Sequence, residues 1–289
     1  MVTTFMLDAY SLVYRAFYAL PTSMADGRGR PVNAVRGFLD MTTRLIEDHH
    51  PDHMVAVYDN DWRPAFRVEA YPGYKAERPE EPPELLPQFE MLAEVLDALG
   101  IPRAEAQGLE ADDVIATLVA GLKEGEDAVI VTGDRDLLCL VRDPNVRLLF
   151  IVRGVSQLRG FDEAEVEKAY DIRPQAYADF ATLRGDPSDG LPGVRGVGPK
   201  RAAQLLGRYG SIDAILDNLD NLPPKLGAAF EEARDYLVAM KIVVPLLRDA
   251  AVEATSARAP DERAVEELKE RYNLGGSITR LLAARKGSS

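Results

Sequence analysis

The stretch that decides the fold is DAVIVTGD, residues 127–134, in which a run of apolar residues ends in an acid. A short apolar run rich in β-branched residues and followed by a glycine predicts a buried strand. Two other stretches have the same form, TTFMLDAY at residues 3–10 and HMVAVYDN at residues 53–60. The three predicted strands therefore lead into Asp134, Asp8 and Asp59.

Helical stretches separate these strands. Residues 34–47 and 84–99 carry apolar side chains at helical spacing. The alternation predicts an α/β fold, a parallel sheet wrapped by helices, because parallel strands need crossover connections. Ligands gather at the carboxyl edge of such sheets. We therefore expect Asp8, Asp59 and Asp134 to share one site.

Further acids lie close to these strand ends in the sequence. The complete set is Asp8, Asp59, Glu110, Asp112, Asp113, Asp134, Asp136, Asp186 and Asp189. The three acids in LEADDVIATL, residues 109–118, have an alternative interpretation, since acids in a first helical turn cap free N–H groups and suit the helix dipole. Together with the strand-end acids, they favour a divalent-metal site, because crowded carboxylates repel one another unless cations share the space. Oxygen ligands suit Mg²⁺ or Mn²⁺.

Length and composition set the limits. The 289 residues are 46% hydrophobic and 28% charged, enough for one large domain or two modest ones. The single Cys139 excludes an internal disulfide, and no apolar run approaches the roughly 18 residues that a membrane span needs. The N-terminus lacks the pattern of a secretory signal. We expect a soluble cytoplasmic protein.

The net charge of −13 at pH 7 is at first sight unfavourable for a nucleic-acid partner. Nine of the acids belong to the predicted pocket, where bound cations would invert the local field, so the rest of the chain carries only −4. Local charge therefore decides whether a phosphate partner is plausible.

A local basic patch follows Leu183, where the sequence becomes rich in Gly and Pro: RGDPSDGLPGVRGVGPK, residues 184–200. The pattern predicts a tight hairpin running into a helix, with Pro199 at a first helical position. Residues 194–208 hold four basic residues and no acid: Arg195, Lys200, Arg201 and Arg208. A helix N-terminus with free N–H groups binds phosphate. The alternative for an isolated Gly-x-Gly is an ordinary capping loop.

The motifs resemble those of the bacterial 5′ nucleases: the 5′ exonuclease domain of DNA polymerase I, phage 5′ nucleases and flap endonucleases. Five stretches carry the resemblance in family order: LDAYSLVYRAFYALP, FRVEAYPGYKAER, GLEADDVIATL, VTGDRDLL and GDPSDGLPGVRGVGPKRAAQLL. They extend from Asp8 to about Leu206. The resemblance implies a PIN-like nuclease domain at 1–180, an arch at about 61–84, and a helical helix-hairpin-helix (H3TH) region at 181–289 that binds DNA.

The resemblance also implies two or more metal ions. By position, Asp8, Asp59, Glu110 and Asp112 would hold the first. Asp112 or Asp113, Asp134, Asp136 and Asp189 would hold the second, with Asp186 acting directly or through water. Two divalent ions about 3.5 to 4 Å apart can activate water and stabilise both oxygens of an in-line displacement, so no histidine base is required. His49, His50 and His53 are interpreted as residues of a solvated loop, because a zinc site needs a fuller ligand set.

The same resemblance implies contacts to DNA. Lys75 and Arg78 would place positive charge on the scissile or flanking phosphates, although each would otherwise be read as part of a solvated face. Arg63 and Arg67 would steer phosphates, and Tyr14 would stack on a terminal base, whereas without the resemblance Tyr14 is a core residue of a helix. The phosphate contacts of the hairpin would be Gly196, Gly198 and Lys200, beside Arg195 and Arg201. Relatives can also hold K⁺ there.

Two positions depart from the family pattern. Gly190 stands where many relatives have Asn, and this difference alters the neighbouring groups that support Asp189 as a ligand. Asp61 is an additional acid near Asp59. Whether Asp61 reaches a metal is left open. These departures, and the absence of a polymerase domain from the sequence, favour a stand-alone enzyme.

The leading hypothesis is a structure-specific, metal-dependent 5′-3′ exonuclease and flap endonuclease that removes 5′ flaps or RNA-containing 5′ ends in replication and repair. Its partners would be DNA, an RNA–DNA hybrid and a DNA polymerase. No membrane is expected as a partner. One alternative is a catalytically weak DNA-structure-binding protein. Another is a phosphatase with Asp8 as nucleophile, but that chemistry wants an acid two residues later, where Tyr10 stands.

Overall fold

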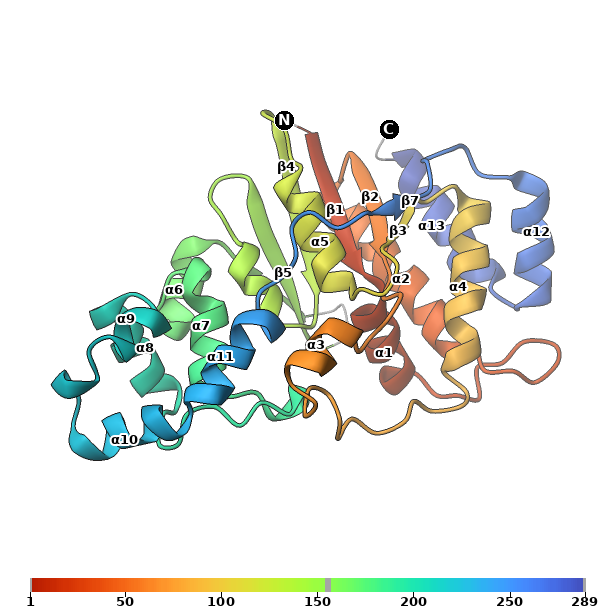
Figure 1. The fold of residues 1–289 in the computed structure, drawn as a ribbon. Coiled ribbons are helices and arrows are strands. Elements are labelled where there is room, and N and C mark those ends of the chain that lie inside the picture. The colour runs from red at the N-terminus through yellow and green to blue at the C-terminus, as the bar shows by residue number, and fades with distance from the viewer. Residues whose placement is uncertain (1, 154–156, 288–289) are drawn as a thin grey trace.

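The computed structural model describes residues 2–153 and 157–287 (Figure 1). Its sheet has seven strands in the order β6-β5-β4-β1-β2-β3-β7 within the described residues. Their bounds are β1 Val2–Asp8, β2 His53–Val57, β3 Arg103–Glu105, β4 Glu126–Thr132, β5 Val146–Arg153, β6 Gln157–Phe161 and β7 Glu253–Ala254. The five central strands are parallel, as predicted, whereas β6 and β7 pair antiparallel at the two edges.

The central strands are apolar because both faces of the sheet are covered. Leu7 of β1 and Ile130 and Val131 of β4 are completely buried, as is Val57 of β2. β1 lies in the middle and pairs with β2 on one side and β4 on the other. The predicted strands at residues 3–10, 53–60 and 127–134 are therefore three adjacent strands.

Helices cover both faces of the sheet, and each face has its own hydrophobic core. One core joins α1 (Ala9–Ala19), α2 (Asn33–His49) and α4 (Leu86–Leu99) with α12 (Glu262–Arg271) and α13 (Gly275–Gly287). The other joins α5 (Ala111–Ala120), α6 (Glu163–Tyr170), α7 (Tyr177–Arg184) and the helices after it. The helices predicted at 34–47, at 84–99 and from Ala111 are α2, α4 and α5.

The helices that follow α7 extend to one end of the molecule (Figure 1). They are α8 (Pro199–Tyr209), α9 (Ile212–Leu216), α10 (Pro224–Glu232) and α11 (Arg234–Val243). Short 3₁₀ turns connect the elements: η1 (Asp136–Leu140), η2 (Pro174–Ala176), η3 (Pro187–Asp189) and η4 (Leu219–Asn221).

After α11 the chain returns to the sheet. The region predicted as one unit, residues 181–289, is therefore divided between two parts of the molecule. β7 adds to β3, and α12 and α13 lie at the opposite end of the molecule from α8 to α10 (Figure 1). The reason is apolar burial: Val265, Ile278 and Leu281 are at most 3% exposed in the core shared with α2 and α4.

The predicted arch at about 61–84 contains one helix, α3 (Ala65–Ala70), which packs against α11. Its remaining residues form turns that lead to α4 (Figure 1). Tyr74 and Lys75 of this segment are only 5% and 8% exposed, so part of it is anchored in the interior. No helix in the described ranges is long and apolar enough to cross a membrane.

Candidate active site

Three acids lie at the carboxyl ends of three adjacent strands. Asp8 is the last residue of β1, and Asp59 and Asp134 each follow their strand, β2 or β4, by two residues. Since β1 lies between β2 and β4, the three acids meet at one edge of the sheet. The predicted placement of these three strand ends is therefore confirmed.

Asp8 connects β1 to its neighbours and is 4% exposed. Its carboxylate accepts hydrogen bonds from the Ser11 backbone N–H at 3.0 Å and from the Thr132 hydroxyl at 2.6 Å. It thus caps α1 and joins the end of β4. Burial, together with the charge of Asp134, raises the pKa of Asp8 to about 6 despite these bonds.

Asp59 connects the end of β2 to the start of α5. It accepts a hydrogen bond of 2.6 Å from the Ala111 N–H. Burial raises the pKa of Asp59 to about 7, with added repulsion from Asp8 and Glu110. Asp8 and Glu110 are therefore close enough to disfavour the ionisation of Asp59.

The acids of α5 and of the loop after β4 face the same space. Burial raises the pKa of Asp112 well above its ordinary value, and repulsion from Asp134 and Asp8 adds to the effect. The pKa values of Asp134 and Asp136 are raised for the same two reasons, with Asp189 as a further repelling neighbour. The acids of five separate segments thus form one acidic pocket.

Part of this acidic pocket encloses a small cavity of 20 Å³, which Asp8 and Asp59 do not line. That volume is enough for one water-sized sphere or an ion. The charged or hydroxyl side chains that line it are Arg67, Tyr74, Lys75, Glu110, Asp112, Asp134, Asp136 and Asp189.

The donor chemistry fits divalent cations, because the acidic side chains are oxygen donors whose mutual repulsion a cation would relieve. Within residues 2–153 and 157–287, however, no three His, Cys, Asp or Glu side chains converge closely enough to hold an ion. The acids surround the pocket while protein cations pair with several of them. Metal binding would therefore require side chains to rearrange within it.

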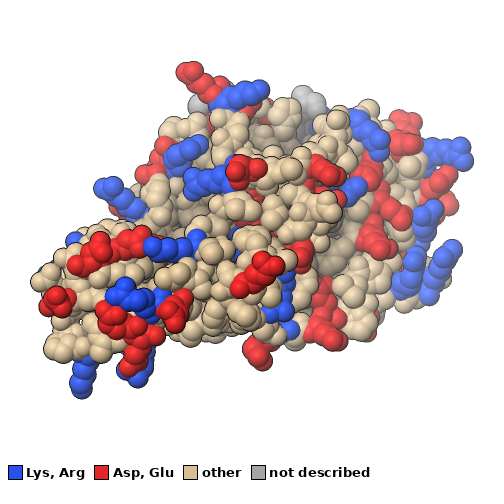
Figure 2. Space-filling model, in the orientation of Figure 1, with Lys and Arg blue, Asp and Glu red and all other residues tan. Residues whose placement is uncertain are grey.

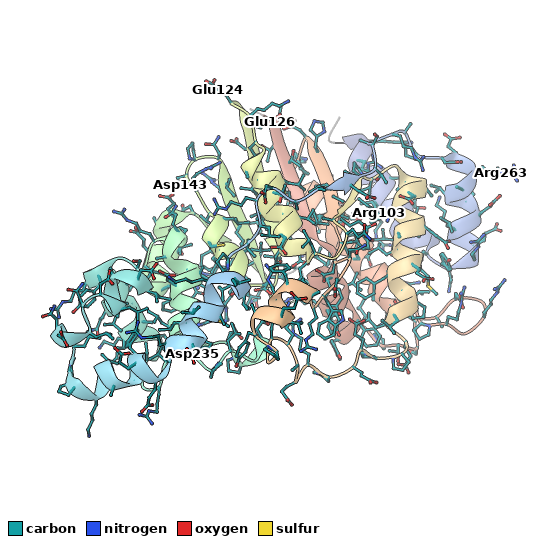
Figure 3. All side chains as sticks on the ribbon, viewed as in Figure 1. Arg103, Glu124, Glu126, Asp143, Asp235 and Arg263 are labelled. Atoms are coloured by element: carbon teal, nitrogen blue, oxygen red, sulfur yellow. The ribbon has the colours of Figure 1, made fainter. Side chains whose placement is uncertain are left out.

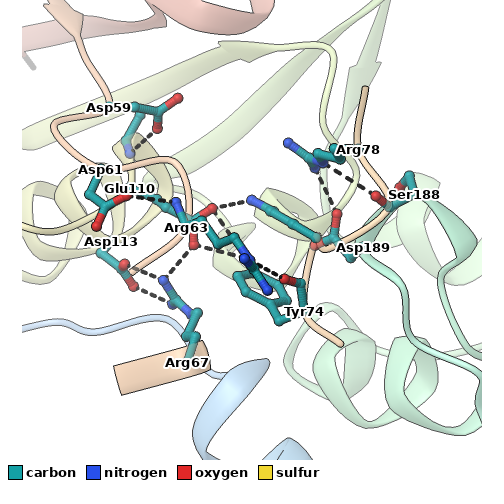
Figure 4. A network of polar contacts seen from close by, with 12 residues as sticks. Asp59, Asp61, Arg63, Arg67, Tyr74, Arg78, Glu110, Asp113, Ser188 and Asp189 are labelled. Carbon is teal, nitrogen blue, oxygen red and sulfur yellow. Dashed lines mark hydrogen bonds and ion pairs between the residues drawn. The ribbon is translucent and has the colours of Figure 1, made fainter. Parts of the chain in front are cut away.

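Glu110 shows this pairing most clearly (Figure 4). Arg67 donates to Glu110 at 2.6 Å, the Tyr74 hydroxyl donates at 2.8 Å, and the Lys75 ammonium contacts its other oxygen. All three partners come from the predicted arch segment. The structure therefore places Lys75 at the acidic pocket. The resemblance implied a position for Lys75 beside the scissile or flanking phosphates.

Arg67 and Asp113 differ from their expected roles. Arg67 is 1% exposed, and its guanidinium donates two hydrogen bonds of 2.7 Å to the Asp113 carboxylate. The Leu247 N–H donates to the same carboxylate at 2.9 Å. Asp113 thus accepts three hydrogen bonds, and the Arg67 guanidinium is held by two carboxylates, so neither the expected metal ligation nor the expected phosphate contact fits these positions. Successive helical residues point about 100° apart, so Asp113 faces away from the pocket that Asp112 lines.

Arg78 and Asp189 form the other side of the pocket. The Arg78 guanidinium donates to Asp189 at 2.7 Å and to the Ser188 carbonyl at 3.2 Å (Figure 4). Asp186 lies one turn earlier and accepts hydrogen bonds from the Ser188 N–H and hydroxyl at 2.9 and 2.5 Å. Asp189 therefore lines the cavity, whereas Asp186 supports the turn that carries it.

Gly190 allows this loop to approach the arch segment. Its φ is +72°, and a Cβ there would lie 2.4 Å from the Gly73 carbonyl oxygen. The Lys75 N–H donates to the Asp189 carbonyl at 2.9 Å across the same contact. Any residue with a Cβ would clash with the backbone at this position. The close approach of the two segments therefore requires glycine at position 190.

Three other predicted residues have local partners. Arg63 donates to the Tyr74 and Pro72 carbonyls at 2.7 Å each, which holds the turn before Lys75. Asp61 accepts from the Arg63 N–H at 2.9 Å. Tyr14 is partly buried and stacks on Tyr10 with ring centroids 4.9 Å apart. Tyr14 also lies close enough to Arg78 for that charge to influence its pKa, which burial raises.

The predicted hairpin runs into α8 as expected. Gly193 and Gly196 have φ values of +70° and +80°, and Gly198 is the N-cap without a side-chain hydrogen bond. Val194 and Val197 are 3% and 4% exposed and anchor the hairpin in the core. The glycines therefore present backbone at the surface while the valines fix it.

The basic residues of the hairpin are exposed: Arg195, Lys200, Arg201 and Arg208. Arg201 donates to the Gly196 carbonyl at 2.6 Å, and Arg195 pairs with Glu232 at 3.1 Å. Figure 2 shows acidic and basic side chains intermixed over the visible face. The four basic residues therefore lie on the surface, and Arg195 is paired with an acid there.

Sequence reasoning missed Thr132 and Tyr74. Thr132 holds Asp8, and Tyr74 holds Glu110, through the hydrogen bonds described above. Thr132 stands directly before the Gly-Asp at the end of a predicted strand. This position next to a predicted site residue is a signal by which the sequence could have identified Thr132. No local pattern indicates that the hydroxyl of Tyr74 turns inward.

An acidic pocket at the carboxyl edge of a parallel sheet, joined to a glycine-rich hairpin and helices, defines the class of metal-dependent nucleases. Residues 3–171 match the family model of the 5′-3′ exonuclease N-terminal resolvase-like domain, and residues 172–266 match that of the 5′-3′ exonuclease C-terminal SAM fold. The chain belongs to the 5′-3′ exonuclease family. It is a 5′ nuclease that hydrolyses phosphodiester bonds, and its fold is the expected PIN-like domain with a helical C-terminal region.

Known proteins similar to the chain agree. A 5′-3′ exonuclease of Streptomyces coelicolor is 46% identical, with 96% of this chain and 98% of that protein covered. DNA polymerase I of Mycobacterium bovis is 43% identical over 88% of this chain but only 28% of its own length. Among solved structures, the T5 D15 protein co-crystallised with metal ions is 17% identical, with a TM-score of 0.68 over 99% of this chain and all of that one. The catalytic core of Rad2 in complex with DNA substrate is 16% identical, with a TM-score of 0.65 over 98% of this chain and 92% of that one. These two likenesses concern the fold.

Proposed function

We propose that this 5′ nuclease acts on DNA with a 5′ flap or a 5′ end, including ends that contain RNA, during replication and repair. The observation that supports the proposal is the acidic pocket, in which strand-end and helix-start carboxylates meet two cations of the arch segment, Lys75 and Arg78. A basic hairpin that exposes backbone supplies a second contact for phosphates. A substrate with both a duplex and a single-stranded 5′ end would use both features.

Mg²⁺ or Mn²⁺ is the proposed cofactor, with two or more ions per site. Asp8, Asp59, Glu110 and Asp112 would hold the first, and Asp112, Asp134, Asp136 and Asp189 the second, with Asp186 acting through water. When bound, such ions activate water and neutralise the charge of the attacking and leaving oxygens. Oxygen-only donors favour these hard cations over zinc.

The residues of the chain supply orientation and charge. Lys75 and Arg78 are held on Glu110 and Asp189, which places both cations at the edge of the cavity where a phosphate would lie. Positive groups fixed in advance stabilise the charge that develops in the transition state. Asp8 and Asp59 keep the strand ends in place through Thr132 and Ala111. Tyr14 is proposed to stack on a terminal base, and Arg63 to steer phosphates from the turn before Lys75.

The hairpin is proposed to bind the duplex. Gly196 and Gly198 expose backbone, while Arg195, Lys200 and Arg201 add positive charge beside the N-terminus of α8. K⁺ is a proposed additional ligand of this hairpin. The division at residue 180 into a nuclease part and a DNA-binding part also stays a proposal, with residues 253–287 assigned to the sheet side. A DNA polymerase is the proposed protein partner, and the cytoplasm the proposed location.

The direct test uses a 5′-end-labelled flap substrate, a blunt duplex and an RNA-containing 5′ end, each with Mg²⁺ or Mn²⁺. We expect cleavage at the junction of the flap and at the RNA-containing end, with the blunt duplex cut more slowly. Intact flap under both metals would overturn the proposal.

Calorimetry separates this function from that of a catalytically weak DNA-structure-binding protein. The nuclease should release or absorb heat on titration with Mn²⁺, and Asp134→Ala should weaken that binding. Flap binding without saturable metal binding would favour the alternative.

A further inference from the structure

Lys75 lies among the acids of the proposed metal site. Its ammonium group contacts one oxygen of Glu110, and the residue is only 8% exposed although it carries a charge. The acids that line the small cavity together with Lys75 are Glu110, Asp112, Asp134, Asp136 and Asp189. A buried cation needs carboxylates around it, and crowded carboxylates need a cation. In this structure Lys75 therefore supplies positive charge where a metal ion is proposed to bind.

The backbone at Lys75 is strained. Its φ is +52°, a left-handed conformation that residues other than glycine rarely adopt. Such a conformation persists only where surrounding contacts hold it. Two contacts hold it here: the ammonium contact with Glu110, and the hydrogen bond of 2.9 Å that the Lys75 N–H donates to the Asp189 carbonyl. Both partners are proposed metal ligands, so the conformation of Lys75 depends on the state of the metal site.

Two neighbours of Lys75 in the chain bind the same two acids. The Tyr74 hydroxyl donates to Glu110 at 2.8 Å, and the Arg78 guanidinium donates to Asp189 at 2.7 Å (Figure 4). Residues 74–78 are therefore attached to the acidic pocket through Glu110 and Asp189. Since a carboxylate oxygen in contact with an ammonium group is not free for a second cation, Lys75 and a divalent ion compete for Glu110.

We propose that residues 74–78 form a latch, which is bound to Glu110 and Asp189 in the metal-free protein and dissociates from them when a divalent ion binds. The latch rests on the metal ligands assigned under the proposed function. By linkage, the factor by which the ion loosens the latch equals the factor by which the latch weakens binding of the ion. The change is confined to these residues, because Arg67 also binds Asp113 and the Val243 carbonyl and so keeps α3 in place.

The test measures amide hydrogen exchange of the full chain by mass spectrometry, in EDTA and in saturating Mn²⁺. Mn²⁺ should speed the exchange of the amides of residues 74–78 about 5-fold or more and leave residues 65–70 of α3 unchanged. The direction is diagnostic, because a bound ligand ordinarily slows exchange around its site. Unchanged or slower exchange of residues 74–78, in a protein that binds Mn²⁺ by calorimetry, would overturn the latch.

Variants separate the latch from a simple effect of charge. Lys75→Met should tighten Mn²⁺ binding about 5-fold or more, and residues 74–78 should exchange rapidly even in EDTA, with no further increase in Mn²⁺. Lys75→Arg keeps the cation and should restore the slow exchange in EDTA. Lys168→Met is the matched control, because it removes an exposed pair of the same kind, with Glu165, and should change neither measurement.

Unfolding curves establish that each variant is folded. Slow exchange of residues 74–78 in Lys75→Met, as in the wild type, would overturn the latch even if Mn²⁺ bound more tightly. No saturable Mn²⁺ binding by the wild type would overturn the assigned metal ligands and the latch with them. Cleavage of flap DNA by the wild type tests the proposed function separately.

Discussion

The Arg67 guanidinium binds the Asp113 carboxylate through two hydrogen bonds of 2.7 Å in the interior of the protein. Arg67 also donates to Glu110 at 2.6 Å and to the Val243 carbonyl at 2.8 Å. One arginine of α3 thereby joins α5, which carries proposed metal ligands, to the end of α11.

Removing Arg67 should therefore destabilise the fold strongly. Arg67→Ala leaves the buried carboxylates of Asp113 and Glu110 with fewer partners, and we expect a loss of about 3 to 5 kcal/mol in the free energy of unfolding. Urea unfolding monitored by circular dichroism measures it. Arg44→Ala, which removes an exposed pair with Asp48, should cost at most about 1 kcal/mol. Equal effects of the two substitutions would contradict the structural role of Arg67.

Asp134→Ala should reduce cleavage of flap DNA more than about 100-fold while leaving flap affinity nearly unchanged. The substitution removes a proposed metal ligand and spares the hairpin. Glu124→Ala is the control, because Glu124 lies near the opposite end of β4 (Figure 3). Turnover and binding are measured on the same substrate, and wild-type turnover in Asp134→Ala would refute the assigned role.

Lys75→Met should lower kcat by about 10² to 10³ with a small change in KM. The ammonium group contacts Glu110 at the edge of the cavity, so its charge is fixed where the transition state would develop charge. Lys123→Met, at an exposed site, serves as control. A rise in KM alone would show that Lys75 contributes only to binding.

Divalent metal should stabilise the folded protein. Binding at 100 times the dissociation constant contributes about 2.7 kcal/mol. For a chain of this size we expect Tm to rise by about 5 °C or more in Mg²⁺ or Mn²⁺. Asp112→Asn should reduce the rise. An unchanged Tm in both metals, measured against an EDTA sample, would speak against the site.

Cys139 should react slowly with thiol reagents in the native state. Burial raises the pKa of its thiol to about 12, so almost no thiolate is present at pH 8. In the unfolded chain the ordinary thiol pKa applies, and a larger fraction is ionised at that pH. Labelling with a thiol-reactive disulfide at pH 8, with and without urea, measures the contrast. Rapid native labelling would contradict the raised pKa of this partly buried thiol.

Much of the site follows from local patterns. The apolar runs before Asp8, Asp59 and Asp134 predict strands, and parallel strands of one sheet bring their carboxyl ends to the same edge. The glycines and Pro199 likewise predict the hairpin and the start of α8. Each of these predictions depends on residues that are neighbours in the chain.

The roles of Arg67 and Asp113 could not be obtained in this way. Their contact joins residues 46 positions apart, and the sequence around Arg67 gives no sign that its charge is buried. Similarly, Glu253 and Ala254 lack the apolar pattern of a strand, yet they pair with β3 because that edge is open.

The sequence by itself determined three of the five central strands, the acids at their ends and the family. Periodicity and turn chemistry are local properties, and they are sufficient for these features. The tertiary structure alone decided which acids face the pocket and which are neutralised, since that depends on the cations that distant segments bring. It turned Asp112 inward and Asp113 toward Arg67, and it returned the C-terminal helices to the sheet.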